Sequence, residues 1–354
     1  QLAGTDITTA PQSTFIGGYS GFKTTTGSDN TAIGYGSLYN NITGIQNTAL
    51  GRSALENHTG SLAVAVGQSA LQQNQTASNT AVGYVVAANN TTGTGLTAMG
   101  YESMYLNTTG ANNVAYGQQS LRNNTTGGSN TALGHLALYT NTTASSNTAL
   151  GLQALYSNSS GTQNTGVGNN ALYANTSGSY STAVGHDALK SNTSGVSNTA
   201  FGSIALDAMT TGNYNVAVGS GSLGAATTGS RNVAVGTSAL TDLTTASNNT
   251  AVGDGALANN TTASNNVAVG KDALEANTTA NYNTAIGYEA LLSTTTGAEN
   301  TAVGAFALDA VTTGSQCTAV GYNAATANTA TATTAVGHQC LKANTSGAGN
   351  VAMG

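Results

Sequence analysis

The chain has 354 residues and a formal net charge of −6, and only 6% of its residues are charged, against roughly 25% in an average soluble domain. Such sparse charge argues against a nucleic-acid surface or a basic membrane-binding patch, because both need clustered Lys and Arg. Glycine is abundant at 46 residues, two cysteines cannot form a disulfide framework, and no apolar run is long enough to span a membrane as a helix.

Residues 1–12 precede a repeat that fills the rest of the chain. We therefore expect a lead-in or cap segment over 1–12 and a single β-roll repeat domain over 13–354. The first repeat is atypical, with Phe15, Tyr19 and Phe22 at positions where later repeats differ. Atypical terminal repeats are usual in solenoid proteins.

The repeat is marked by a glycine in a fixed context, which occurs at 21 positions between Gly17 and Gly354. Seventeen of the 20 intervals between these glycines are 17 residues long, and three are 16. The unit reads N-T-A-V-G-x-x-A-L-x-x-N-T-T-G-x-x, as in Asn130–Ser146, and its first glycine is position 5. A period of this length indicates a solenoid of stacked coils rather than a disordered chain.

Each repeat is predicted to contain two short strands. Position 2 is always Thr or Val and position 4 is nearly always aliphatic, and this alternation predicts a strand over positions 1 to 5. Positions 8 and 9, usually Ala-Leu, predict a second short strand, and N-T-T-G supplies turn residues. We expect an all-β fold, a parallel β-roll (β-solenoid) of about 21 coils of 17 residues with two short strands per coil.

The composition of the first strand predicts which of its faces points outward. Position 3 is Ala in 19 of 21 repeats, whereas position 6 uses twelve residue types, so position 3 is confined inside the coil. Successive strand residues face opposite sides, so positions 2 and 4 point outward and form an apolar stripe that a soluble monomer would not expose. The residues expected at the resulting oligomer interface are Val64, Val82, Val114, Val184, Val218, Val235, Val252, Val269, Val303 and Val320.

These strands resemble a known family. The strand N-T-A-V-G at Asn79–Gly83, Asn249–Gly253 and Asn300–Gly304 resembles the S-V-A-I-G strand of YadA-like adhesin heads, and N-V-A-V-G at Asn232–Gly236 and Asn266–Gly270 is closer still. The longer form with A-L-x-x-N-T-T-G is similar to repeats of phage tail fibres. The resemblance implies a left-handed parallel β-roll that assembles as a homotrimer, with these strands facing the three-fold axis. The 17-residue repeat is longer than is common in adhesin heads, so a longer outer turn is expected.

No pattern in the sequence points to catalysis. The histidines lie in different repeats and are expected as isolated surface residues: His58, His135, His186 and His338. Gly219–Gly224 matches G-x-G-x-x-G, but that motif binds a dinucleotide only between a strand and a helix. Because no paired carboxylates or calcium-binding Gly-Asp repeats occur, we expect no enzyme, no cofactor and no metal site.

The two cysteines lie in neighbouring repeats. Cys317 takes the place of the position 1 asparagine, and Cys340 takes the place of the position 8 alanine. These positions are not equivalent, which favours two separate packed thiols over a disulfide.

Asparagine at position 12 often begins a glycosylation sequon, as at Asn107, Asn124, Asn141, Asn192 and Asn277. Glycosylation would suit an extracellular surface loop. The same residues are also what a tight turn needs, and other repeats form the turn without a sequon. Turn chemistry is therefore favoured over glycosylation.

Tyrosine is the best candidate for recognition. Tyr139, Tyr156 and Tyr173 share position 10 in three consecutive repeats, and Tyr39 and Tyr105 hold the same position nearer the N-terminus. Side chains one coil apart are expected to stack in a ladder that could contact a surface glycan or a protein receptor. The alternative, which we favour for any single tyrosine, is a packing ladder that stabilises the coil.

Taken together, the sequence predicts an extracellular fibrous attachment protein, such as an adhesin head or a tail-fibre shaft, whose first partner is its own chain. The alternative is an extracellular filament whose subunits stack end to end, because the last repeat stops inside the strand motif and would leave backbone groups unpaired. Neither prediction involves nucleic acid or insertion into a membrane.

Overall fold

A computed structural model describes residues 2–354, which form 21 parallel β-strands of three residues each and no helix. The chain divides into two compact units, an N-terminal unit that ends at Ser179 and a C-terminal unit over Tyr180–Gly354. The N-terminal unit holds β1 (Thr14–Ile16), β2 (Thr31–Ile33), β3 (Thr48–Leu50), β4 (Val64–Val66), β5 (Thr80–Val82), β6 (Thr97–Met99), β7 (Val114–Tyr116), β8 (Thr131–Leu133), β9 (Thr148–Leu150) and β10 (Thr165–Val167). The C-terminal unit holds β11 (Thr182–Val184), β12 (Thr199–Phe201), β13 (Val216–Val218), β14 (Val233–Val235), β15 (Thr250–Val252), β16 (Val267–Val269), β17 (Thr284–Ile286), β18 (Thr301–Val303), β19 (Thr318–Val320), β20 (Thr334–Val336) and β21 (Val351–Met353).

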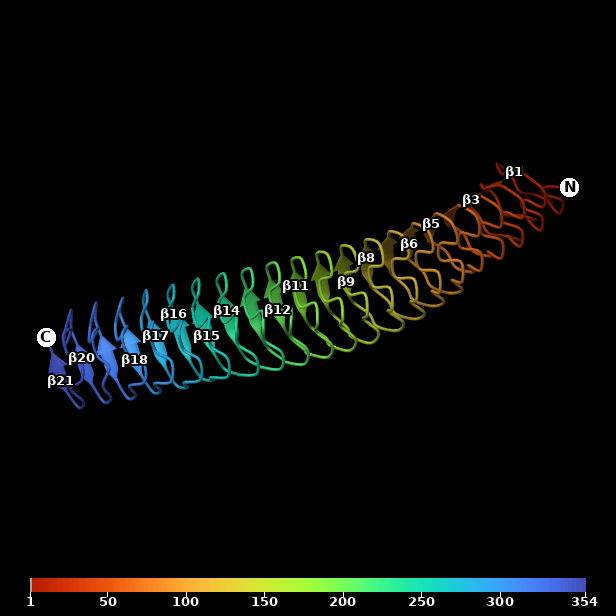
Figure 1. Cartoon of the computed structure of the whole chain (residues 1–354). Helices are drawn as coiled ribbons and strands as arrows, with labels where there is room; N and C mark the ends of the chain where they lie inside the picture. Colours follow the sequence, from red (N-terminus) through yellow and green to blue (C-terminus); the bar gives the residue numbers. More distant parts are fainter. Residues whose placement is uncertain (1) are drawn as a thin grey trace. The chain divides into compact units, whose positions relative to one another are not determined.

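Within each unit, consecutive strands pair in parallel and without a shift in register. Ala32 of β2 pairs with Ala49 of β3, and Ala217 of β13 pairs with Ala234 of β14, so equivalent positions of the repeat lie side by side. Figure 1 shows the strand arrows of each unit following one another in chain order, with the turns on the other side of each coil. The predicted all-β, parallel β-solenoid with a 17-residue repeat is confirmed.

The strands face as the sequence predicts. Position 3 points into the coil, since Ala132 of β8 has no exposed surface while Thr131 and Leu133 on either side are half-buried. The same pattern of a buried middle residue between two more exposed ones holds from β2 to β20. Positions 2 and 4 therefore form the outer surface of each sheet, which we call the strand face.

The predicted second strand at positions 8 and 9 is wrong. Ala154 and Leu155 are both fully buried, whereas neighbouring residues of a strand would point to opposite sides. The chain achieves this by placing positions 7 and 9 in the left-handed region, with φ of 56° at Gln153 and 53° at Leu155. This segment is a turn rather than a strand, and its N–H groups still bond to the next coil, as from Leu155 to the Ala171 oxygen at 2.9 Å.

The glycine at position 5 is required by both conformation and space. Gly151 has φ of 138°, a value that side-chain-bearing residues rarely adopt. A Cβ atom there would overlap the carbonyl group of Gly168 in the next coil. Stacked glycines thus allow the backbone to turn out of each strand while coils stay at strand spacing.

Two columns of asparagine line the interior. At position 1, the Asn130 backbone N–H donates to Asn113 Oδ1 at 2.9 Å. At position 12, Asn124 Nδ2 donates to Asn107 Oδ1 at 2.7 Å and to the carbonyl oxygen of Gly127 in its own turn at 2.9 Å. These bonds satisfy polar groups that would otherwise be costly to bury, and they hold each turn against its neighbours.

Residues 2–12 contain no strand but lie against the first coil. The Gly4 N–H donates to the Ser20 oxygen at 2.9 Å, and the Thr8 N–H donates to the Thr25 oxygen at 3.0 Å. In that coil Phe15 takes the place of the usual alanine, and Gly21 takes the place of the usual leucine, so that a Cβ on Gly21 would overlap the Phe15 ring. Compared with later coils, the large side chain is at position 3 and the small one at position 9, so the volume that fills the interior stays similar.

Candidate functional site

The predicted tyrosine ladder forms in the N-terminal unit. Each of its tyrosines follows a fully buried leucine, so the rings leave the interior and lie half-buried on the outside. The Tyr139 and Tyr156 centroids are 5.3 Å apart with 4° between the planes, and the Tyr156 and Tyr173 centroids are 5.2 Å apart at 7°. Burial between the two neighbouring rings raises the pKa of Tyr156, and electrostatic interaction with Tyr173 and Tyr139 raises this pKa further. The three rings thus form one continuous stack, which we call the tyrosine ladder.

The other two predicted tyrosines are not part of this stack. Tyr39 stacks on Phe22 instead, with centroids 5.1 Å apart and 12° between the planes. Tyr105 faces the Arg122 guanidinium at 5.2 Å, and that guanidinium also pairs with Glu102 at 2.7 Å. Position 10 holds Glu, Gln and Ala in the coils between Tyr39 and Tyr105, and Arg122 in the coil between Tyr105 and Tyr139, so the five tyrosines fall into three separate groups.

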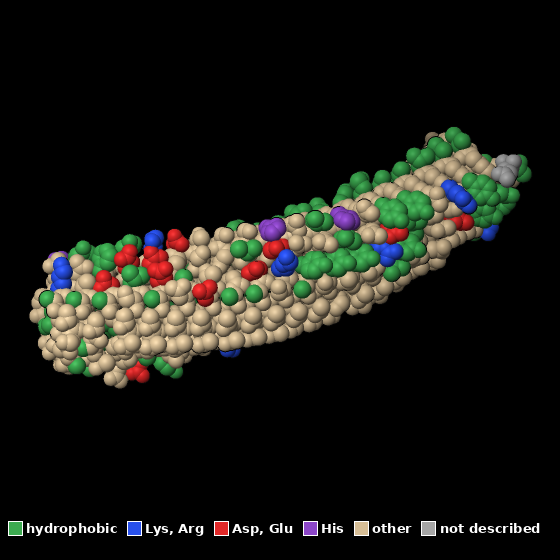
Figure 2. Space-filling view, in the orientation of Figure 1, with side chains coloured by type: hydrophobic (Ala, Val, Ile, Leu, Met, Phe, Trp, Pro, Cys, Tyr) green, Lys and Arg blue, Asp and Glu red, His purple; other side chains and the backbone are tan. Residues whose placement is uncertain are grey.

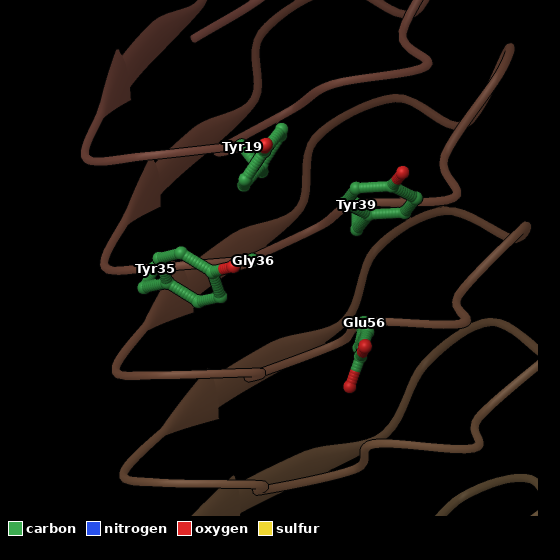
Figure 3. Close-up of a pocket in the computed structure, with 5 residues that line it drawn as sticks. All are labelled: Tyr19, Tyr35, Gly36, Tyr39 and Glu56. Atoms are coloured by element: carbon green, nitrogen blue, oxygen red, sulfur yellow. The ribbon is translucent and has the colours of Figure 1, made fainter. Parts of the chain in front are cut away.

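A hollow on the surface of the N-terminal unit lies beside Tyr39. It has a volume of about 350 Å³ and is lined by Tyr19, Tyr35, Gly36, Tyr39 and Glu56. Figure 3 shows the three rings and the carboxylate placed around Gly36. Of this group, the sequence predicted only Tyr39 as a candidate binding residue. The unusual aromatic residues of the first coil were the signal that could have located it.

Further aromatic rows lie in both units, mainly at position 6 of the repeat. Tyr84 and Tyr101 stack with centroids 5.6 Å apart at 5°. In the C-terminal unit a row runs through Tyr288, Phe306, Tyr322 and His338, the last two stacked at 5.5 Å. Within each unit, Figure 2 shows hydrophobic side chains mixed with basic and acidic ones, beside a surface of backbone and uncharged polar side chains.

The ten valines predicted at an oligomer interface all lie on the strand face. Val252 and Val320 are 36% and 38% exposed, and the other eight are half-buried. Several larger side chains at position 4 are more exposed, as with Phe201 at 57%. No strand residue from β1 to β21 is charged, so this face offers only Thr, Val and other uncharged side chains to its surroundings.

The sequon asparagines do not lie in a surface loop. Side chains of all five are fully buried: Asn107, Asn124, Asn141, Asn192 and Asn277. Asn141 Nδ2, for example, donates to Asn124 Oδ1 at 2.9 Å and to the Ala144 oxygen of its own turn at 3.0 Å. The folded coil leaves no room for a glycan at these positions, and the asparagines hold the turn from inside.

One histidine differs from the expected surface role. His58 occupies position 12 and is fully buried, with Nε2 3.0 Å from Asn47 Oδ1 and Nδ1 2.9 Å from Asn74 Nδ2. Nε2 faces the acceptor oxygen Asn47 Oδ1 and therefore carries the hydrogen of the neutral ring, while Nδ1 accepts from Asn74 Nδ2. Nδ1 also lies 3.2 Å from the Asn74 backbone oxygen, to which it can donate only when the ring is protonated. Burial lowers the pKa of His58 from 6.5 to about 4, although hydrogen bonds to the Asn74 and Gly60 backbone oppose this.

The remaining chemistry-bearing residues stay apart. His135, His186 and His338 are exposed, as expected. Both thiols are free, with Cys317 buried in the asparagine column, where its N–H donates to Asn300 Oδ1 at 2.9 Å. Among residues 2–354, no three His, Cys, Asp or Glu side chains gather where they could hold a metal ion. The glycine-rich stretch after β13 leads into a turn rather than a helix.

The geometry defines the chain as a repeat protein of the parallel β-solenoid class. Protein-family models find no match in it, and comparison with curated proteins finds no relative. No helix long and apolar enough to cross a bilayer occurs in the described part of the chain.

Proposed function

We propose that the chain is an extracellular fibrous attachment protein that assembles as a homotrimer through its strand faces. The observation that carries the proposal is the strand face itself, where position 4 is uncharged in all 21 strands and many of its side chains are at least one-third exposed. Apolar surfaces of this extent are normally covered by a partner. Every coil repeats the same face, so a second and third copy can cover it without any further element.

The energetics of covering this face are favourable. Burying a Val-sized side chain completely is worth roughly 1.5–3 kcal/mol, so a half-buried valine still gains about 1 kcal/mol. Association costs on the order of 4–15 kcal/mol in lost freedom of motion. About ten valines per chain are therefore of the right order to offset this cost, and the position 4 Ile, Leu and Phe side chains add to the gain.

The aromatic residues support a role in contact with other surfaces. Position 10 lies outside the strand face, so trimerisation leaves the tyrosine ladder accessible. Tyrosine combines rigid apolar area with a hydroxyl, which suits both glycans and protein loops. The extracellular location rests on the resemblance of the N-V-A-V-G strands to adhesin heads and tail fibres.

Light scattering on the purified chain tests the assembly. The wild type is expected to have three times the 34.8 kDa chain mass. Val235→Asp with Val252→Asp should lower this mass or unfold the chain, because unpaired carboxylates would meet inside the interface. Thr245→Asp with Thr262→Asp, on exposed turns of the same region, is the matched control and should remain trimeric. A folded monomer would contradict the trimer, and indefinite fibres would support the filament instead.

Attachment itself is tested on the tyrosine ladder. Replacing Tyr139, Tyr156 and Tyr173 together by alanine should abolish adhesion to the target surface if the ladder is a receptor site. Thermal stability of the same variant separates the two roles, because loss of adhesion with an unchanged melting temperature identifies a contact surface. A lower melting temperature with retained adhesion identifies a packing ladder.

A further inference from the structure

The hollow beside Tyr39 is built by three consecutive coils of the N-terminal unit. Tyr19 comes from the turn after β1, Tyr35 and Tyr39 come from the turn after β2, and Glu56 comes from the turn after β3. Gly36 lines the hollow between these side chains, and a Cβ added there would meet only Ser53 Oγ, at a van der Waals distance of 3.8 Å. We call this site the aromatic hollow.

The three rings of the aromatic hollow stand at angles to one another. Tyr19 and Tyr35 are nearly perpendicular, with centroids 5.6 Å apart and 87° between the planes. Tyr19 and Tyr39 are 6.2 Å apart at 58°. Stacked rings, such as those of the tyrosine ladder, offer a flat edge, whereas rings at these angles form the walls of a cage (Figure 3). A cage suits a compact, rounded group better than the flat ring of a sugar.

Charge at the aromatic hollow favours a cation. Glu56 supplies the carboxylate, and its Oε2 accepts a hydrogen bond from Gln72 Nε2 at 2.6 Å. Within residues 2–354, Arg52 of the same turn makes no ion pair with that carboxylate. The Lys23 ammonium lies 5.4 Å from the centroid of the Tyr39 ring. A cation of the chain itself is thus already drawn to one of these rings.

From these observations we propose that the aromatic hollow binds a compact organic cation of the quaternary or methylated ammonium class. The faces of the tyrosine rings carry partial negative charge, which attracts such a cation, and Glu56 supplies a full negative charge beside them. A methylated ammonium group loses little hydration when it enters an apolar cage, whereas a sodium ion would lose its water. The volume of about 350 Å³ is large enough for a small ligand. The inference does not depend on the attachment role.

The test is a titration of the whole chain with tetramethylammonium chloride, and with sodium chloride at equal ionic strength as the reference. Binding is followed by NMR on the ligand and by tyrosine fluorescence, which is usable because the chain has no tryptophan. Tyr35→Ala and Glu56→Gln should each weaken binding about tenfold, equivalent to about 1.4 kcal/mol. Tyr322→Ala, an equally exposed tyrosine of the C-terminal unit, is the matched control and should leave binding unchanged.

Lys23→Gln gives the sharpest outcome. The substitution removes the ammonium group that lies against the Tyr39 ring, and with it a positive charge that repels the ligand. Tetramethylammonium should therefore bind about threefold more tightly. Melting temperatures show that each variant remains folded, and Tyr35 is exposed enough for its loss to be tolerated. The proposal is overturned if tetramethylammonium binds no better than sodium. It is also overturned if a neutral saccharide binds instead and Glu56→Gln and Lys23→Gln leave tetramethylammonium binding unchanged.

Discussion

The buried histidine makes the N-terminal unit sensitive to acid. His58 replaces an asparagine of the interior column, and its ring is held neutral between Asn47 and Asn74. Unfolding releases the ring into water, where its pKa returns to about 6.5. Between pH 6.5 and pH 4 the unfolded chain therefore binds a proton that the folded chain does not. By linkage, the free energy of unfolding must fall as the pH is lowered through this window.

The size of the effect follows from the two pKa values. A drop from 6.5 to about 4 corresponds to roughly 3 kcal/mol, at about 1.4 kcal/mol for each pKa unit. His58→Asn restores the residue found at this position in the coils on either side, Asn41 and Asn74. The variant should keep the stability of the wild type at pH 7.5 and should exceed it by about 3 kcal/mol at pH 4.

Denaturant unfolding of both proteins at pH 7.5, 6, 5 and 4 measures this difference. Asp and Glu side chains also titrate at the acid end, but they are common to both proteins and cancel in the comparison. The two proteins should diverge steadily below pH 6.5. Parallel stability curves over the whole range would refute the account of His58 as a buried, neutral residue.

Three further predictions concern stability and are measured by thermal and chemical unfolding. Gly151→Ala should destabilise by roughly 3 kcal/mol or more, because φ of 138° and the next coil exclude a side chain. Gly221→Ala should cost only about 1 kcal/mol, because an added Cβ would meet no atom closer than Ser238 Oγ at 4.0 Å, and equal losses for the two variants would contradict this. Tyr156→Ala should cost about 1–3 kcal/mol through two lost ring contacts, and Tyr282→Ala, 63% exposed, should cost almost nothing; no difference would mean that stacking contributes nothing. Burial raises the pKa of Asp309, whose Oδ1 has no partner within residues 2–354, so the folded state favours the protonated acid and loses stability as the pH rises. Asp309→Asn should therefore raise the melting temperature at pH 7 but not in acid, and an unchanged value at pH 7 would count against it.

The repeat pattern was enough to predict the coil and the direction of its strand. The 17-residue period and the near-invariant alanine at position 3 both reflect confinement inside the stack, so they survive in the sequence. The second strand was not predictable in this way. Ala-Leu at positions 8 and 9 is equally compatible with a strand and with a turn. A left-handed leucine such as Leu155 is disfavoured locally, and only its burial and its bond to the next coil stabilise it.

The asparagine columns show a second limit of sequence reasoning. Asn-Thr-Thr is typical of an exposed turn, and nothing in one repeat indicates that Asn124 points inward. Its side chain is satisfied by Asn107 of the preceding coil and by a carbonyl group of its own turn. Burial is possible only because the coils stack in register. The interior role therefore depends on the three-dimensional arrangement.

Only part of the candidate site could be predicted from the sequence. Tyrosines at the same position in consecutive repeats lie one coil apart and stack, so the 17-residue period was enough to predict the tyrosine ladder. The aromatic hollow joins positions 6, 7 and 10 of three coils, and only the path of the turn brings Tyr19, Tyr35 and Glu56 together.

The central claim is that the strand faces of different copies meet, and cross-linking tests it most directly. Val235→Cys places a thiol on the strand face, and Thr245→Cys places one on an exposed turn nearby, both in a chain carrying Cys317→Ser and Cys340→Ser. A short bifunctional maleimide should link copies of the Val235→Cys chain rapidly, at dilutions where Thr245→Cys remains unlinked. Equal linking of both variants, or a Val235→Cys chain that stays unlinked, would contradict the account.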